Sequence, residues 1–64
     1  MNQGTIKFYN AVKGYGFIIG NETGEEVFFH VTGLLYSAPQ KDDIVNYEIE
    51  VAERGKKAIE VKKA

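Results

Sequence analysis

One stretch of the chain alternates strictly between apolar and polar residues, and this pattern limits the possible folds more than any other feature. Residues 45–51 read Val-Asn-Tyr-Glu-Ile-Glu-Val. A period of two is that of a β-strand with one face in the core and the other in water. No segment shows the three-and-four spacing and the caps of an amphipathic helix. The sequence therefore predicts an all-β fold.

Turn-forming residues divide the rest of the chain into short extended segments. Glycine and polar clusters occupy residues 10–14, 20–26, 39–43 and 54–57. Between them we expect strands at residues 5–10, 15–19, 27–31, 44–51 and 58–62, with one helical turn near residues 32–35. Five short strands in a chain of 64 residues are typical of a closed antiparallel barrel, which leaves no exposed edge. We expect a single domain over residues 1–64.

Composition excludes several classes of protein. The chain has no cysteine and one histidine, His30, so we expect neither a disulfide framework nor a metal site. It has no leader and no apolar run of about 18 residues, so we expect a cytoplasmic protein without a membrane partner. Ser37 has no histidine to act as its base, and Asp42 and Asp43 are expected to form a turn. With no phosphate-binding loop either, we expect no catalysis and no cofactor.

Charged residues are distributed unevenly along the chain. The formal net charge is -1, yet residues 1–21 contain Lys7 and Lys13 and no acid. Six of the eight phenylalanines and tyrosines precede residue 30. The acidic pair Glu25 and Glu26 is expected on a solvated face that repels nucleic acid from the wrong side. The overall charge therefore does not exclude a nucleic-acid partner.

Alternation also separates inward from outward side chains. The inward set is Ile6, Ile18, Val27, Phe29, Val45, Tyr47, Ile49, Ile59 and Val61. On the second and third segments the outward set, which should be polar, is mostly aromatic: Tyr15, Phe17, Phe28 and His30. Phe8 and Tyr9 are consecutive and cannot both be buried in a regular strand, so at least one should join them unless a bulge turns it.

An exposed cluster of rings usually marks a binding surface. Rings interleaved with lysines suit single-stranded nucleic acid, in which each stacked base contributes about 1–3 kcal/mol. Two other interpretations remain open. The rings could cover a second layer of core, although the chain has no spare segment for that layer, or they could hold a peptide. An RNA-recognition motif is disfavoured because it needs two helices behind its sheet.

The segment from Lys13 to Ile18 reads Lys-Gly-Tyr-Gly-Phe-Ile and matches the start of a ribonucleoprotein sequence. It follows Gly-Thr-Ile-Lys-Phe-Tyr-Asn at residues 4–10 and precedes Val-Phe-Phe-His at residues 27–30 and a closing Arg54-Gly55 turn. In this order the motifs resemble those of bacterial cold-shock proteins over the whole chain. The resemblance implies a five-stranded antiparallel Greek-key barrel of the oligonucleotide-binding (OB) type.

The resemblance also implies a function and a set of site residues. It implies low-specificity binding of single-stranded RNA and DNA by a passive RNA chaperone, acting in the cold-shock response and in transcription or translation. The expected binding residues are Lys7, Phe8, Tyr9, Lys13, Tyr15, Phe17, Phe28, His30 and Tyr36. Among these, Tyr9 and the loop residue Tyr36 correspond least directly to the family pattern. We expect a monomer, with pairing through the aromatic surface as the alternative.

Four departures from the family pattern carry expectations of their own. Lys56 and Lys57 replace the usual proline and glutamine after the glycine, and their added charge should reach phosphates. Phe8 replaces the usual tryptophan, and Val31 replaces a third aromatic residue, so binding should be weaker and more sensitive to salt. Phe29 stands where an inward valine is usual. Either Gly16 or Gly33 makes room for this larger ring in the core, or the ring turns outward.

Overall fold

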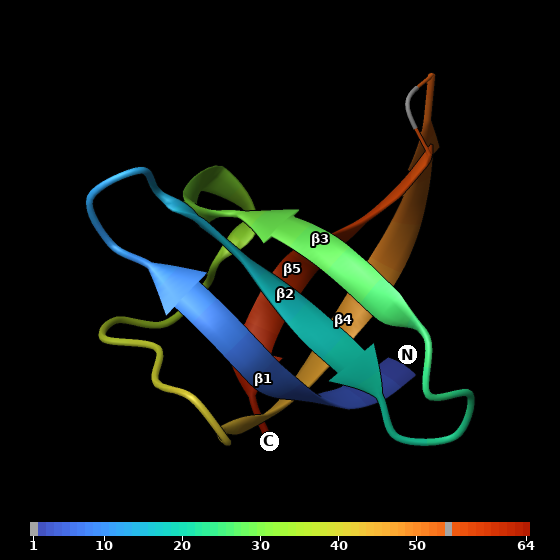
Figure 1. The fold of residues 1–64 in the computed structure, drawn as a ribbon, viewed down its shortest axis with the longest axis horizontal. Helices are drawn as coiled ribbons and strands as arrows, with labels where there is room; N and C mark the ends of the chain where they lie inside the picture. The colour runs from blue at the N-terminus through green and yellow to red at the C-terminus, as the bar shows by residue number, and fades with distance from the viewer. Residues whose placement is uncertain (1, 54) are drawn as a thin grey trace.

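The computed structural model describes residues 2–53 and 55–64 as five strands and one 3-10 turn (Figure 1). The elements are β1 (Asn2–Asn10), β2 (Tyr15–Gly20), β3 (Glu26–His30), η1 (Val31–Gly33), β4 (Ile44–Ala52) and β5 (Gly55–Lys63). All five expected strands and the helical turn are confirmed, although β1 and β5 each begin three residues earlier than predicted. In the described part of the chain, no helix is long and apolar enough to cross a membrane.

The strands form a closed barrel in the order β1-β2-β3-β5-β4, with β4 pairing back onto β1. The expectation of a wholly antiparallel barrel is wrong for one pair, because β3 and β5 run parallel. After β3 the chain crosses the barrel through η1 and a long loop before it enters β4. β5 then returns antiparallel to β4 and closes the barrel beside β3, in the same direction as β3.

The barrel interior contains most of the side chains that alternation assigned to it. The buried set is Ile6, Ile18, Val27, Phe29, Val45, Tyr47, Ala58 and Val61. Ile49 is half-buried and packs against this core. The inward assignment of Ile59 is wrong, because Glu60 has a φ of 50° and a β-bulge opposite Tyr47 breaks the alternation of β5. The bulge turns Ala58 inward in place of Ile59.

Phe29 fills the centre of the core in space that Gly16 leaves. The two residues are paired across β2 and β3, and Phe29 has no exposed surface. A Cβ atom at Gly16 would lie 2.8 Å from the ring atoms Cε1 and Cζ of Phe29 and would also collide with the carbonyl oxygen of Phe8. Of the alternatives left open by the sequence, the inward ring accommodated by Gly16 is therefore confirmed.

A second bulge, in β1, determines which of the consecutive rings Phe8 and Tyr9 faces the core. The register with β2 shifts between Ile6 and Phe8, so that Phe8 pairs with Phe17 and points outward. Tyr9 then points toward the core, where its ring stacks on Phe29 at a centroid distance of 5.9 Å and an interplanar angle of 7°. Strand alternation sends the two rings to opposite sides of the sheet, and the bulge makes Tyr9 the inward one.

The positive φ of Glu60 should cost stability, and a glycine should recover part of that cost. The left-handed region costs a residue with a Cβ about 1–2 kcal/mol, while glycine loses about 0.5–1 kcal/mol in chain entropy. We expect Glu60→Gly to raise the free energy of unfolding in urea by up to about 1 kcal/mol. Glu60→Ala removes the same charge but keeps the Cβ, so it should bring no gain. An equal gain in both variants would assign the effect to charge.

Candidate functional site

Four aromatic side chains gather on the outer surface of β1, β2 and β3, and we call this surface the aromatic face. Its members are Phe8, Tyr15, Phe17 and Phe28. Phe8 pairs with Phe17 and Phe17 pairs with Phe28, so three rings stand in one row across adjacent strands. The ring of Tyr15 contacts all three, with centroid distances of 5.9 to 6.1 Å. The outward rings expected from the sequence therefore form one continuous apolar surface.

His30 borders the aromatic face at the end of β3, where it is exposed and paired with Tyr15. Its Nδ1 atom accepts a hydrogen bond of 3.2 Å from the backbone N–H of Thr32 and lies 3.0 Å from the Thr32 hydroxyl. This contact caps η1 and fixes the ring. Because Nδ1 is the acceptor, the ring hydrogen is placed on Nε2, which has no partner among the described residues. His30 can thus donate a hydrogen bond to a ligand.

The two predicted lysines have different surroundings. Lys7 lies 2.8 Å from the carboxylate of Glu26, and both side chains are about half exposed. Lys13 is exposed in the loop after β1, where its backbone N–H donates to the side-chain oxygen of Asn10 at 3.0 Å. The expectation that Glu26 faces away from the site is wrong, because it shares the outward side of β3 with Phe28. Folding brings this acid beside a lysine 19 residues away.

Lys57 lies next to Phe28 at the edge of this surface. The sequence indicates Lys56 and Lys57 only as added charge after the closing turn, without placing either beside a ring. The parallel pairing of β3 with β5 sets these two residues side by side. The Nζ atom of Lys57 lies 3.3 Å from the carboxylate of Glu50 on β4. Its only signal in the sequence is the adjacent lysine pair at residues 56–57. Which strand those lysines border depends on the barrel topology.

Tyr9 and Tyr36 are not brought to the aromatic face. Tyr9 packs on the core, as described above, and Tyr36 is half-buried against the core from the loop before β4. The Tyr36 hydroxyl donates a 3.0 Å hydrogen bond to Oδ2 of Asp43, which also accepts one of 3.0 Å from the backbone N–H of Gln40. Burial and the neighbouring carboxylate of Asp43 raise the pKa of Tyr36. In this structure Tyr36 anchors the loop.

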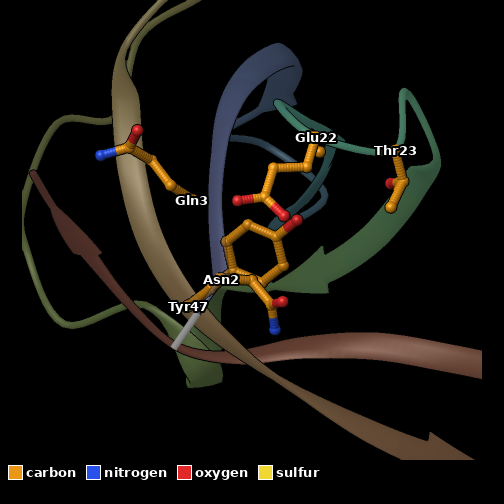
Figure 2. A pocket seen from close by; sticks show the side chains of 6 residues that line it. Asn2, Gln3, Glu22, Thr23 and Tyr47 are labelled. Atoms are coloured by element: carbon orange, nitrogen blue, oxygen red, sulfur yellow. The ribbon is translucent and has the colours of Figure 1, made fainter.

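A separate hollow of about 140 Å³ lies at the other ends of β1 and β2 (Figure 2). It is lined by Asn2, Gln3, Gly20, Glu22, Thr23 and Tyr47. Burial raises the pKa of Tyr47, and the charge of Glu25 adds to this shift. The carboxylate of Glu22 faces the hollow in Figure 2, so its polar, acidic lining contrasts with the aromatic face. Within residues 2–53 and 55–64, no group of three or more histidine, cysteine, aspartate or glutamate side chains is placed to hold a metal ion.

The hydrogen bonds that Asp43 accepts in this loop should make the free energy of unfolding depend on pH in the acid range. Hydrogen bonds from the Gln40 N–H and the Tyr36 hydroxyl hold the pKa of Asp43 below its usual 3.8. Its stabilising contribution is therefore complete above pH 3.8 and is lost as the pH falls through the lower pKa of the folded state. We expect Asp43→Asn to flatten the acid side of a plot of unfolding free energy against pH. An unchanged acid limb would contradict this role.

Comparisons with known proteins agree with this architecture. The family model described as 'Cold-shock' DNA-binding domain matches residues 2–64. Cold shock protein CspC of Bacillus subtilis is 37% identical over 67 residues that cover all of both chains. The Major cold shock protein of Streptococcus pyogenes serotype M1 is 35% identical, with 98% of this chain and 97% of that protein covered.

Other relatives are longer proteins that contain a similar region. Y-box-binding protein 1 of Xenopus laevis is 35% identical over 91% of this chain and 22% of its own length. The solved structure of drosophila Unr CSD456 superimposes with a TM-score of 0.82 at 29% identity, covering 98% of this chain and 26% of that one. With a family match over residues 2–64 and relatives similar along their whole length, the chain belongs to the cold-shock DNA-binding domain family.

Proposed function

We propose that this chain binds single-stranded nucleic acid on the aromatic face with low sequence specificity. The observation that carries the proposal is the row of outward rings on three adjacent strands, with Tyr15 in contact with each of them. Unpaired bases expose flat apolar surfaces that stack on such rings, and every base has one. Membership of a family described as DNA-binding supports the same ligand class.

The rings and the side chains around them have different roles in binding. Bases stack on Phe8, Phe17 and Phe28, while Tyr15 supports these rings through its contacts with each. The free Nε2–H of His30 donates to a base or phosphate oxygen. Lys13 and Lys7 lie near phosphates, and Lys7 exchanges the carboxylate of Glu26 for a phosphate when the strand binds. Because that ion pair is exposed, breaking it costs about 0–1 kcal/mol.

Binding of this kind opens RNA structure without a chemical step. A protein that binds only the unpaired strand shifts a hairpin toward its open form by mass action. Duplex bases are already stacked on each other and cannot lie on the rings. We therefore propose a passive RNA chaperone, active as a monomer in the cytoplasm, with roles in the cold-shock response and in transcription or translation. It needs no cofactor and has no enzymatic activity.

Salt and strandedness test the proposed ligand. Each phosphate contact with single-stranded nucleic acid contributes a log-log salt slope of about -0.7, so two lysines predict about -1.4. We expect a short thymine or uracil oligomer to bind with such a slope, and a duplex of equal length to bind poorly. Tyrosine fluorescence can follow the titration because the chain has four tyrosines and no tryptophan. Absence of single-strand binding at low salt would contradict the proposal and favour a peptide ligand.

Adjacent phenylalanines on opposite sides of β3 provide a matched pair of variants. Phe28→Ala should weaken oligonucleotide binding by about 1–3 kcal/mol, since it removes one stacking ring, and should leave the fold intact. Phe29→Ala removes the fully buried ring and should lower the free energy of unfolding by about 3–5 kcal/mol. Urea unfolding and titration of each variant separate the two effects. If Phe28→Ala unfolded the domain as Phe29→Ala does, the assignment of the two faces would be wrong.

A further inference from the structure

Tyr47 brings a hydroxyl group to one end of an otherwise apolar core. The residue is only 3% exposed, and its buried neighbours in the core are aliphatic or phenylalanine. Among the residues that the structure describes, none forms a hydrogen bond with this hydroxyl, whose oxygen opens onto the hollow of about 140 Å³ at the ends of β1 and β2. A nearly buried hydroxyl without a partner costs stability, so a ligand that bonds to it would recover that cost.

The hollow is open because position 20 has no side chain. A Cβ atom at Gly20 would lie 2.9 Å from the hydroxyl oxygen of Thr23 and 3.3 Å from that of Tyr47. Two hydroxyl groups therefore converge above this glycine. The loop that carries Thr23 is held by a 2.8 Å hydrogen bond from the Gly24 N–H to the Gly20 carbonyl, and the Glu25 N–H donates to the Thr23 hydroxyl oxygen at 3.1 Å. The two hydroxyl groups are thus in place before any ligand binds.

The lining of the hollow favours a cation that donates hydrogen bonds. Every lining residue except Gly20 has a side-chain oxygen, and Glu22 adds a full negative charge (Figure 2). Of the described residues, none that lines the hollow is positively charged. Burial raises the pKa of Tyr47 and the charge of Glu25 adds to the shift, so a second carboxylate also acts on this end of the barrel. A primary ammonium, with three N–H donors and no acceptor, complements such a lining.

The size of the hollow limits the ligand to a small group. Its volume is below the range of about 300–1,000 Å³ that is usual for drug-sized ligands. It therefore has room for an ammonium group and a few methylene groups. A metal ion is a poorer fit, because the described residues bring together no group of three histidine, cysteine, aspartate or glutamate ligands.

We propose that this hollow binds the ammonium end of a primary alkylamine. Glu22 supplies the opposite charge, and the hydroxyl oxygens of Tyr47 and Thr23 accept hydrogen bonds from the ammonium N–H groups. A free amine and a lysine side chain of another protein both carry this group. The hollow lies at the ends of β1 and β2 opposite to Phe8 and Tyr15, so the site is separate from the aromatic face and does not rest on the proposed function.

Titration of the whole chain with n-butylammonium at constant ionic strength tests this site. The backbone amide NMR signals of Gly20, Thr23 and Tyr47 report binding at the hollow. Tetramethylammonium is the matched ligand control, because it has the same charge and no N–H donor. Nα-acetyl-lysine amide presents the same ammonium as a protein side chain does, so its affinity relative to that of n-butylammonium distinguishes the two sources.

Four variants identify the groups that bind the ammonium. Tyr47→Phe removes the hydroxyl and keeps the buried ring, Glu22→Gln removes the charge, and Gly20→Ala fills the space between the hydroxyl groups. Glu53→Gln is the charge-matched control, since Glu53 is exposed between β4 and β5, away from the hollow. Urea unfolding of each variant shows whether the barrel is intact.

We expect saturable shifts with n-butylammonium and none with tetramethylammonium. Tyr47→Phe should weaken binding by about two- to tenfold, the value of one hydrogen bond, and Glu22→Gln by about tenfold or more. Gly20→Ala should also weaken binding, whereas Glu53→Gln should bind like the wild type. A tighter fit of acetyl-lysine amide than of n-butylammonium would make a protein lysine the natural ligand, and the reverse order a free amine.

Three results would overturn the site. They are equal shifts with both ammonium ions, equal losses in Glu22→Gln and Glu53→Gln, and wild-type affinity in a folded Tyr47→Phe. An absence of any saturable shift in the wild type would likewise leave the hollow to water alone. Because these titrations contain no nucleic acid, their failure would leave the proposed function intact, and a failure of oligonucleotide binding would leave this site intact.

Discussion

The ring of Phe29 packs into the space that Gly16 leaves by having no side chain, and the register of the neighbouring strands depends on this packing. A domain of this size has room for few large core residues, and Phe29 is the largest fully buried one. Its ring needs the space above Gly16, which fixes the pairing of β2 with β3. Because side chains alternate along a strand, the same pairing turns Phe17 and Phe28 to the outside. The core contact and the aromatic face are therefore two consequences of one register.

Much of the fold could be predicted because strand alternation and turn residues are local signals. The pattern at residues 45–51 and the glycine clusters were sufficient for all five strands. The misassignment of Ile59 has a local backbone cause, since a Glu at position 60 gives no sign of the left-handed φ that produces the bulge. The parallel pairing of β3 with β5 is a property of the whole topology. Neither feature has a sequence pattern that a single chain reveals.

The positions of the site residues were also predictable only in part. Strand alternation placed Phe17, Phe28 and His30 correctly on the outer surface, because each follows an inward residue in a regular strand. The side to which Tyr9 turns depends on the bulge in β1, and the position of Tyr36 depends on a loop that packs on the core. The partners Glu26 and Lys57 come from distant parts of the chain. Their positions required the closed barrel.

The mutual contacts of the four rings have a consequence for where the entropy of binding is lost. Each ring of the aromatic face already touches at least one other, and a hydrogen-bonded ladder holds the strands that carry them. Rings restrained in this way lose little rotamer freedom when a flat ligand stacks on them. For a flexible single strand, the ordering cost of the complex then falls on the nucleic acid. Nucleic-acid strands that are already extended and unpaired should therefore bind more tightly than strands that must first be straightened.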